Sequence, residues 1–399
     1  MLSAESRPYI DASVPVLREH GLAITQRFYK NMFAAHPQLH NLFNAGNQAN
    51  GSQQQSLASA VFAYAANIDN QAALAPVVSR IVHKHASVGI TADHYPIVGE
   101  HLLRAIKEVL GDAATPELIA AWAEAYGVLA NALINEEKRL YQAAGIEAGQ
   151  LSEMRVVAVN NESELVRSFT LTPVDGALPS FHPGQYVSVA VHLPSGLRQL
   201  RQYSLSDAPN GRHLRISVKR EVAGHETPAG MVSNWLHDNL AVGSVVQVSK
   251  PFGDFRPDTE SDKPIVLLSA GVGITPMISA LNRIAEVAPQ RRVIFAHAAR
   301  DEKHHPHQDD VALAAARMPN LQTVFFYEDL SAGKPGKSAV GGRMVIDKLP
   351  QWDAANTDVY MCGPLPFMQD QWASLVKRGV PAKHLHREVF GPDMLDHLI

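Results

Sequence analysis

The sequence predicts a multidomain fold in which an all-α segment is followed by an antiparallel β-barrel and then by a doubly wound α/β domain. Three changes of pattern carry this prediction. Residues 1–145 place apolar residues three and four positions apart, residues 154–260 contain short strands separated by turns, and residues 261–399 alternate strands with helices. A chain of 399 residues has room for two or three domains.

Composition narrows the classes of function. With 46% apolar residues, 19% charged residues and a net charge of -4, the chain has no positive excess for binding nucleic acid. Its longest apolar run, from Ile265 to Leu281, contains glycine and proline and is shorter than the roughly 20 residues of a membrane span. Because the first residues also lack the pattern of a signal peptide, we expect a cytoplasmic protein without a transmembrane segment.

The single cysteine, Cys362, limits the redox chemistry. One thiol cannot form an intrachain disulfide, and a cysteine-ligated iron–sulfur cluster needs several thiolates. We therefore expect a reducing compartment, and any electron transfer must use other cofactors.

Two polar residues in the helical segment interrupt apolar faces. Glu137 lies in line with Leu133 and Leu140 on a helix that we expect to begin at Pro116, with Thr115 as its cap. A carboxylate there either has a hydrogen-bonding partner or reaches solvent near the helix end, and the pattern alone favours neither. Gln53 shares a face with apolar residues as well, which is typical of the wet edge of an amphipathic helix.

The 19 histidines are ambiguous when taken singly. His85 lies near the end of an apolar helical stretch, 81–89, but most helical histidines are solvated or hydrogen-bonded structural residues. The run His304-His-Pro-His307 has donors for a metal ion, yet a solvated loop is the favoured interpretation.

The residue composition changes near residue 145, from an apolar helical pattern to small, polar and glycine-containing residues. We predict a linker over 146–153. The strands expected after it are Met154–Val159, Val166–Thr172, Tyr186–His192 and Leu214–Lys219, with Pro/Gly/Asn/Ser turns between them. Further strands are expected at Arg292–His297, Thr323–Tyr327 and Asp358–Cys362.

Three motifs in this half suit nucleotides. Gly271-Val-Gly-Ile-Thr-Pro276 lies between a strand and a helix, where glycines let a pyrophosphate approach amides at the helix start. Its last position is Pro rather than Gly, so an ordinary tight turn is the alternative. Arg201-Gln-Tyr-Ser204, together with Tyr186, can meet a flavin diphosphate and ring, and the helix start at Gly230 can take the same phosphates.

These motifs carry a family resemblance. Residues from about 153 onward resemble the ferredoxin-reductase family of flavin and nicotinamide oxidoreductases, through Arg201-Gln-Tyr-Ser204, Gly271 to Pro276, Tyr360-Met-Cys-Gly-Pro364 and Glu388-Val-Phe-Gly-Pro392 in that order. Residues 1–145 resemble a bacterial globin, through Phe28-Tyr29, Asn50-Gly-Ser-Gln53, Lys84-His85, Tyr95 to Leu103 and Ala125 to Ala130. The whole chain is therefore similar to a flavohaemoglobin, with a globin domain at 1–145, an FAD domain at 154–260 and an NAD(P)H domain at 261–399.

The resemblance implies roles at the matching globin positions. It makes His85 the proximal iron ligand, Tyr29 the distal hydroxyl over bound oxygen, and Gln53 and Leu57 the rest of the distal wall. Tyr95 and Glu137 would hydrogen-bond behind the histidine. Glu136 adjoins Glu137 and competes for that role, but Glu137 fits the apolar face better; His83 is expected to be ordinary helix surface.

It also implies the reductase positions. The FAD positions are Tyr186, Arg201, Gln202, Tyr203 and Ser204, with Val389, Phe390, Gly391 and Pro392 at the C-terminus; the nicotinamide positions are Gly271, Val272, Gly273, Ile274, Thr275 and Pro276. Lys84 and Glu388 are expected to tune the redox centres.

The function implied is that of a nitric oxide dioxygenase that uses haem b, FAD and NADH or NADPH to convert NO and O2 to nitrate. We expect a monomer that needs no second redox protein. The alternative, from another class, is a haem-based redox or gas sensor with a built-in reductase, and a weaker one is a reductase for an outside acceptor. Two segments depart from the family: the linker lacks the usual Gly-Gly-Trp, and 328–342 leaves NADH against NADPH open.

Overall fold

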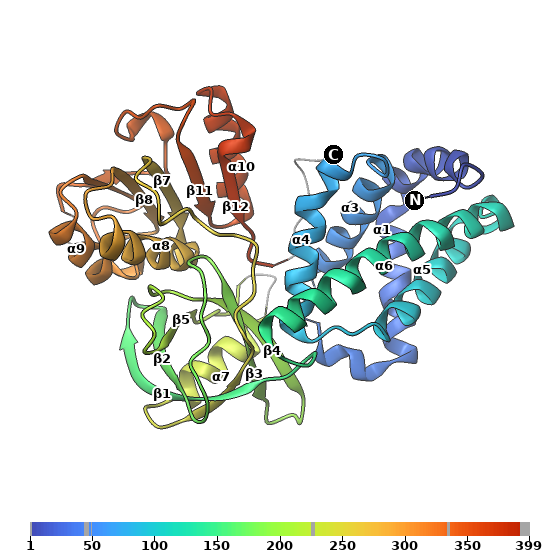
Figure 1. Ribbon diagram of the computed structural model, residues 1–399, viewed down its shortest axis with the longest axis horizontal. Helices are drawn as coiled ribbons and strands as arrows, with labels where there is room; N and C mark the ends of the chain where they lie inside the picture. Colours follow the sequence, from blue (N-terminus) through green and yellow to red (C-terminus); the bar gives the residue numbers. More distant parts are fainter. Residues whose placement is uncertain (1, 44–47, 49, 225–227, 333–335, 392–399) are drawn as a thin grey trace. The chain divides into compact units, whose positions relative to one another are not determined.

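The computed structural model describes residues 2–43, 48, 50–224, 228–332 and 336–391 (Figure 1). The chain divides into two compact units. The first comprises Met1–Leu151, His192–Arg201 and Gly391–Ile399, and the second comprises Ser152–Val191 and Gln202–Phe390. Most of the predicted reductase thus belongs to the second unit, but His192–Arg201 and the residues from Gly391 onward are assigned to the first.

The first unit contains a helical bundle. Its α-helices are α1 (Arg7–Ala35), α3 (Ser52–Ala66), α4 (Gln71–Val88), α5 (His94–Leu110) and α6 (Pro116–Ala144), with short 3-10 helices at Pro37–Asn41 and Gly111–Ala113. Helix α1 packs against α3 and α5, and α4 packs against α6. The expected cap at the start of α6 is present, because Thr115 Oγ1 accepts from the amide of Leu118 at 3.2 Å. The predicted all-α domain is confirmed.

Helix α6 is long and apolar enough to span a membrane by length and composition. Such a helix, taken singly, is weak support for a membrane span, because core helices of soluble proteins pass the same test. In this bundle α6 buries Trp122, Ala125 and Leu133 against its neighbours and also buries Glu137.

An antiparallel sheet belongs to the second unit, except that His192 and Arg198–Arg201, at the ends of two of its strands, are assigned to the first. Its strands are β1 (Ser152–Asn161), β2 (Val166–Pro173), β3 (Tyr186–His192), β4 (Arg198–Ser204), β5 (Leu214–Lys219) and β6 (Val245–Val248), in the order β4-β3-β6-β1-β2-β5. An antiparallel bridge between Leu205, which follows β4, and Ile216 of β5 connects the two edge strands of this sheet. Helix α7 (Met231–Asn239) follows β5. The four predicted strands are present, whereas the four-residue β6 was too short to show in the sequence pattern.

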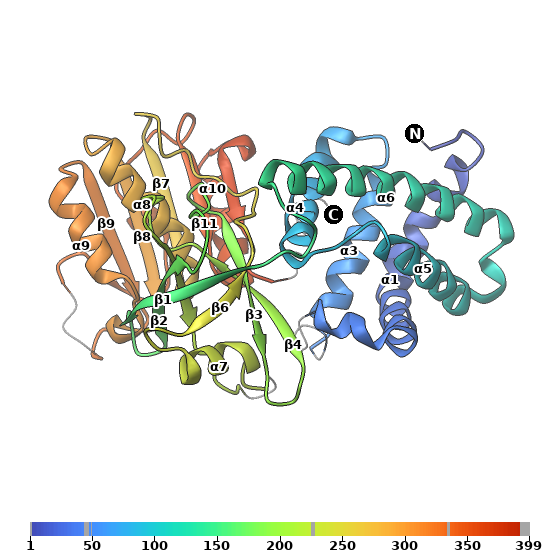
Figure 2. The same cartoon turned by 60° about the horizontal axis from the view of Figure 1, so that its bottom comes forward.

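The rest of the second unit is a parallel sheet (Figure 2). Its strands are β7 (Ile265–Ala270), β8 (Val293–Ala299), β9 (Leu321–Tyr327), β10 (Ala339–Gly341), β11 (Asp358–Cys362) and β12 (Leu385–Glu388), in the order β10-β9-β8-β7-β11-β12. Between them lie α8 (Ile274–Val287), α9 (Gln308–Arg317) and α10 (Leu365–Lys377), with 3-10 helices at Gly271–Gly273, Glu302–His304, Ile346–Lys348 and Ala382–His384.

Both faces of this sheet are covered. Ile265 and Leu267 of β7 pack in the cluster that contains α8 and α9, whereas Val266 and Leu268 pack in the cluster that contains α10. Side chains alternate between the faces of a strand, so the continuous apolar run of β7 serves two cores. The predicted doubly wound fold is confirmed.

Two expectations about histidines are wrong. His305 and His307 are 1% and 0% exposed, so their loop is not a solvated one. His305 Nδ1 shares a hydrogen bond of 2.8 Å with the hydroxyl of Tyr327, and internal partners of this kind replace the water that the sequence suggested. His83, expected on the helix surface, is 9% exposed and therefore buried.

Gly99 in α5 provides a test of packing in the helical bundle. A Cβ there would lie 2.6 Å from Cε1 of Tyr126, whose hydroxyl is tied to the carbonyl of Tyr95 at 2.6 Å. Because that ring cannot move without losing its bond, we expect Gly99→Ala to lower the free energy of unfolding by about 1–3 kcal/mol. Denaturant unfolding followed at the haem absorption band measures the change.

Gly21→Ala is the matched control in α1. Its Cβ would meet Ala58 Cβ at 3.5 Å, an ordinary contact, so we expect no loss and up to about 1 kcal/mol of gain from helix propensity. Equal losses in both variants would show that Tyr126 is not held in place.

Candidate functional site

A buried carboxylate joins two side chains in the helical bundle. Glu137 is 2% exposed, and its Oε1 accepts from the hydroxyl of Tyr95 at 2.5 Å and from Nδ1 of His85 at 2.8 Å. Since a carboxylate accepts, this contact places the His85 proton on Nδ1 and leaves the Nε2 lone pair for a ligand. The side chain of His85 is 36% exposed, so it is accessible. An imidazole held in this way is the donor that haem iron takes from a protein.

Three helices, α4, α5 and α6, contribute His85, Tyr95 and Glu137 and hold them in place. Helix α4 ends at Val88, three residues after His85. Its C-cap is Gly89, whose φ of 82° suits glycine, and the amide of Ile90 donates to the His85 carbonyl at 3.1 Å. Tyr95 lies in the first turn of α5. Tyr141, one turn beyond Glu137 on α6, donates to the carbonyl of Ile90 at 2.8 Å. The end of α4 is therefore tied to the helix that carries the carboxylate.

The predicted linker contacts the end of α4. A Cβ on Gly89 would lie 2.5 Å from Cα of Gly149, so the two backbones touch within the first unit. Glycine at 89 thus serves both the left-handed end of α4 and this close approach. The sequence did not reveal it, because a contact between two distant glycines leaves no pattern.

The tyrosine behind His85 is a permanent donor. Burial and, after it, the hydrogen bond to Glu137 raise the pKa of Tyr95 far above its ordinary value. Burial likewise raises the pKa of Tyr126, which donates to the carbonyl of Tyr95. Both phenols therefore stay protonated at any physiological pH and keep the carboxylate in place.

The predicted distal residues lie on α1 and α3. Tyr29 is 5% exposed, and burial raises its pKa to about 12 although a hydrogen bond with Gln53 lowers it. Its ring packs edge-on against Phe28 and Phe43 at centroid distances of 4.8 and 5.7 Å. Gln53 is therefore a partner of Tyr29 rather than only a wet helix edge. Leu57, one turn further along α3, packs against the same core.

The predicted flavin positions lie at the start of β3 and on β4, with Arg201 assigned to the first unit and Tyr186 and Gln202–Ser204 to the second. The hydroxyl oxygen of Ser204 is buried and has no hydrogen-bond partner among the described residues, so it suits the polar edge of a ligand. Arg201 and Tyr203 are partly exposed, and Gln202 is exposed. Gly253, with φ of 123°, brings its backbone close to the ring of Tyr186, where a Cβ would lie 3.1 Å away.

Helix α7 packs against β5, and the amides of its first turn are free of partners within the helix. Its N-cap is Gly230, where a Cβ would lie 2.5 Å from Oγ of Ser233 and 2.8 Å from Cβ of Glu221. Glycine is therefore required for this close turn, and the amides that follow it can face phosphate oxygens. The donor chemistry of this region fits a flavin nucleotide.

The glycine turn after β7 lies where the parallel sheet reverses its strand order. A Cβ at Gly273 would be 2.3 Å from the carbonyl oxygen of Cys362, and one at Gly363 would be 3.1 Å from Cβ of Ala270. The turns after β7 and β11 thus touch, which is the place where doubly wound sheets bind nucleotides. Gly271 and Val272 are partly exposed. The side chains of Ile274, Thr275 and Pro276 are buried, so they shape the helix start and offer no surface to a ligand.

The predicted C-terminal contacts are divided between the units. Glu388 and Val389 are buried and Phe390 is 44% exposed in the second unit, while Gly391 belongs to the first; Pro392 lies outside the described residues. Oε1 of Glu388 accepts from the amide of Val389 at 2.9 Å. Lys84 donates through Nζ to the carbonyl of Gly391 at 2.5 Å within the first unit.

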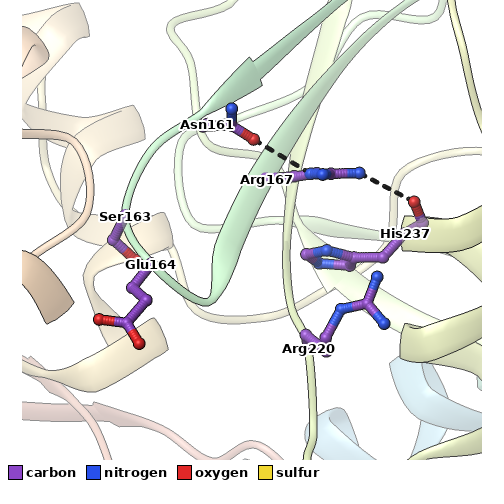
Figure 3. A pocket seen from close by; sticks show the side chains of 6 residues that line it. All are labelled: Asn161, Ser163, Glu164, Arg167, Arg220 and His237. Carbon is purple, nitrogen blue, oxygen red and sulfur yellow. Dashed lines mark hydrogen bonds between the residues drawn. The ribbon is translucent and has the colours of Figure 1, made fainter.

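A separate hollow of about 410 Å³ lies on the barrel (Figure 3) and is lined by Asn161, Ser163, Glu164, Arg167, Arg220 and His237. Arg167 already donates to Asn161 Oδ1 at 3.0 Å and to the carbonyl of His237 at 2.9 Å. Figure 3 shows the His237 ring between the two guanidinium groups, and burial, followed by these charges, lowers its pKa. The two arginines that line this hollow stabilise the fold. None of the predicted site residues lines the hollow.

The geometry defines a class of protein: a haem-binding helical domain joined to a flavin- and nicotinamide-dependent oxidoreductase. Comparison with known families agrees. Residues 26–133 match the Globin family, residues 153–256 the oxidoreductase FAD-binding domain and residues 267–372 the oxidoreductase NAD-binding domain.

The chain belongs to the flavohemoprotein family. It is 47% identical to a flavohemoprotein of Rhizobium meliloti (strain 1021), with 99% of each chain covered, and 48% identical to one of Chromobacterium violaceum, with 98% of each covered. A crystal structure of flavohemoglobin from Malassezia yamatoensis with bound FAD and heme matches with a TM-score of 0.85 at 30% identity, covering 98% of this chain and 100% of that one. The predicted cofactors, haem, FAD and NAD(P)H, are confirmed by these matches.

Substitution of Glu137 tests the carboxylate behind His85, the predicted iron ligand. Glu137→Gln removes the negative charge that holds the His85 proton, so the imidazole becomes a weaker electron donor to iron. We expect a lower iron–histidine stretching frequency in the ferrous protein, measured by resonance Raman spectroscopy, and about 10–100-fold lower turnover.

Glu136→Gln is the control, because Glu136 has a side chain that is 48% exposed and pairs with Arg139 on the surface. It should leave the frequency unchanged. The same shift in both variants, or none in Glu137→Gln, would remove Glu137 from this role.

Proposed function

We propose that this chain is an NAD(P)H-dependent nitric oxide dioxygenase that converts NO and O2 to nitrate. The observation that carries the proposal is the 2.8 Å contact between Glu137 Oε1 and His85 Nδ1. A globin that only stores oxygen has no need of a carboxylate behind its histidine, whereas oxygen activation gains from one. A match supports this reaction: the FAD/NAD-binding domain of a nitric oxide dioxygenase from Vibrio cholerae covers 60% of this chain at 36% identity, with 99% of that domain covered and a TM-score of 0.56.

When bound, NAD(P)H supplies a hydride, FAD divides it into single electrons, and haem uses those electrons to activate O2. Glu137 holds the proton at His85 Nδ1 and gives the imidazole anionic character. Tyr95 keeps the carboxylate oriented by donating to the same oxygen at 2.5 Å. These residues act by positioning and polarising the ligand.

Tyr29, which packs in a different core cluster from Tyr95, would face the substrate. Its raised pKa of about 12 keeps the hydroxyl protonated, so it remains a donor throughout the physiological pH range. Gln53 holds that hydroxyl, and Leu57 restricts access with an apolar side chain. A donor at this position stabilises negative charge that develops on oxygen.

In the reductase, Ser204 and Tyr186 would bind the flavin ring, Arg201 and the amides of α7 its phosphates, and the turn at Gly271 the nicotinamide nucleotide. Lys84 and Glu388 would tune the redox centres.

We also propose the domain boundaries 1–145, 154–260 and 261–399. We propose that the protein is a cytoplasmic monomer without a transmembrane segment and that it needs no separate redox protein. Direct transfer from flavin to haem needs no cluster between them, in accord with the single cysteine.

Nitrate formation tests the proposal. With NAD(P)H and O2 present, the haem- and flavin-loaded protein should consume NO continuously and release one nitrate for each NO, measured with an NO electrode and by nitrate analysis. His85→Ala should lose haem and nitrate formation but keep NAD(P)H oxidation by the flavin. Loaded protein that binds NO once without forming nitrate in repeated turnovers would refute the dioxygenase and favour a sensor.

Tyr29→Phe tests the distal donor. Loss of a hydrogen bond to a partly charged acceptor is worth roughly 1.5–3 kcal/mol, so we expect O2 to dissociate about 10–100-fold faster and NO turnover to fall. Flash photolysis or stopped-flow spectroscopy measures the O2 dissociation rate.

Tyr9→Phe is the control on the same helix, since Tyr9 is 38% exposed and lies in the first turn of α1. It should leave O2 dissociation unchanged. An equally small effect of both substitutions would show that Tyr29 does not donate to the ligand.

A further inference from the structure

A buried polar cluster connects the barrel to the parallel-sheet domain within the second unit. We call it the Asp310 cluster, and its members are Glu162, Arg215, Ser217, Asn282, His307 and Asp310. Glu162 follows β1, and Arg215 and Ser217 lie on β5. Asn282 lies on α8, while His307 caps α9 and Asp310 lies in its first turn.

Asp310 is the centre of the cluster. Its Oδ1 accepts from Arg215 Nη2 and from Asn282 Nδ2, each at 2.9 Å, and its Oδ2 lies 2.8 Å from Nδ1 of His307. The other nitrogen of His307 shares a 2.9 Å hydrogen bond with Oγ of Ser217. The bonds to Arg215 and Ser217 cross from the α/β domain to the barrel.

The charges in this cluster are removed from solvent. The side chains of Arg215 and Asp310 are 13% and 12% exposed, and that of His307 is 0% exposed. Burial alone would raise the pKa of Asp310, but the hydrogen bond from His307 and the charge of Arg215 hold it well below its usual value. Asp310 is therefore an anion, and removing one of its partners leaves a buried charge without compensation.

The backbone of His307 is strained to place its ring. With φ of 62° and ψ of 28° it is the one non-glycine residue in the described part of the chain with a positive φ. The left-handed region is unfavourable for a residue with a Cβ, and strain of this kind points to a purpose for the side chain.

The donor set also resembles a metal site, since ligand atoms of Glu162, His307 and Asp310 lie within 4.8 Å of one another. However, the guanidinium of Arg215 already balances Asp310 at 2.9 Å, and it would repel a divalent cation. Glu162 also accepts from Ser168 Oγ at 2.5 Å. The cluster is accordingly an ionic contact between domains.

This contact lies directly beside both cofactor motifs. Asp207 follows the flavin motif by three residues, and Ser279 follows the nucleotide motif by three. Ser279 Oγ donates to the carbonyl of Asp207 at 2.7 Å, and Asn282 Nδ2 donates to Asp207 Oδ1 at 3.0 Å. Asn282 thus bridges the segment after the flavin motif and the Asp310 cluster.

We propose that the Asp310 cluster positions the nicotinamide-binding domain against the flavin-binding barrel, with His307 and Asn282 as positioning residues for hydride transfer. Hydride transfer requires the donor and acceptor carbons or nitrogens in near contact, and a displacement of about 1 Å costs on the order of 100-fold in rate. A desolvated, multiply bonded contact that Asn282 ties to Asp207, three residues beyond the flavin motif, limits such displacement.

Anaerobic stopped-flow reduction of the flavin in the full-length holoprotein tests the proposal. We expect His307→Gly, which fits the backbone but lacks the ring, to lower the limiting rate of flavin reduction about 10–100-fold while the nucleotide Kd changes little. His307→Asn tolerates the left-handed backbone and keeps a polar side chain, so its rate should lie between those of His307→Gly and the unaltered protein. With deuterated nicotinamide, the isotope effect should rise in His307→Gly as hydride transfer becomes rate-limiting.

Asn282→Ala provides a second variant if His307→Gly fails to fold, and it should lower the limiting rate in the same way. Arg283→Gln is the matched control on α8, because Arg283 pairs with Glu260 outside the cluster, and it should not change the rate. Limiting rates within twofold of the unaltered protein in both His307→Gly and Asn282→Ala, whatever their melting temperatures, would overturn the proposal. No NO is present, so the outcome is independent of the dioxygenase reaction.

Discussion

The hydrogen bond between Glu137 and His85 is the constraint on which the rest of the haem site depends. A carboxylate that is 2% exposed is tolerable only with partners, and its two partners are His85, the proposed iron ligand, and Tyr95. Three helices, the left-handed end of α4 and the linker at Gly149 converge to hold it. The same burial that makes Glu137 costly also makes it effective, because an ionic hydrogen bond is stronger where water is excluded.

Much of this site was predictable because it depends on local patterns. The position of Glu137 on an apolar face and the cap at Thr115 were visible in helical spacing, and the structure gives Glu137 the partner that its position required. Gln53 was misleading, because a polar residue on an amphipathic face suggests solvent unless its partner is known. That partner, Tyr29, lies on another helix, and a contact between helices has no signature in the spacing of either one.

In the reductase too, local features could be predicted from the sequence, whereas contacts between distant segments could not. The strand, glycine turn and helix at Gly271 follow from sequence, but the reason that Gly273 must be glycine is the carbonyl of Cys362 on a different strand. The histidine run at 304–307 was predicted to be solvated, whereas His307 is buried and belongs to a contact between two domains. Charged and polar residues that meet only after two domains fold are the part of a site that composition and periodicity cannot predict.

We propose above all that a single chain carries electrons from NAD(P)H to a haem suited to oxygen activation. The most direct test is anaerobic addition of NADH or NADPH to the oxidised holoprotein, with the flavin and haem absorption bands followed together and no other protein present. The account predicts that the flavin bleaches and that the haem then converts fully to the ferrous spectrum. Flavin that bleaches while the haem remains ferric would contradict it.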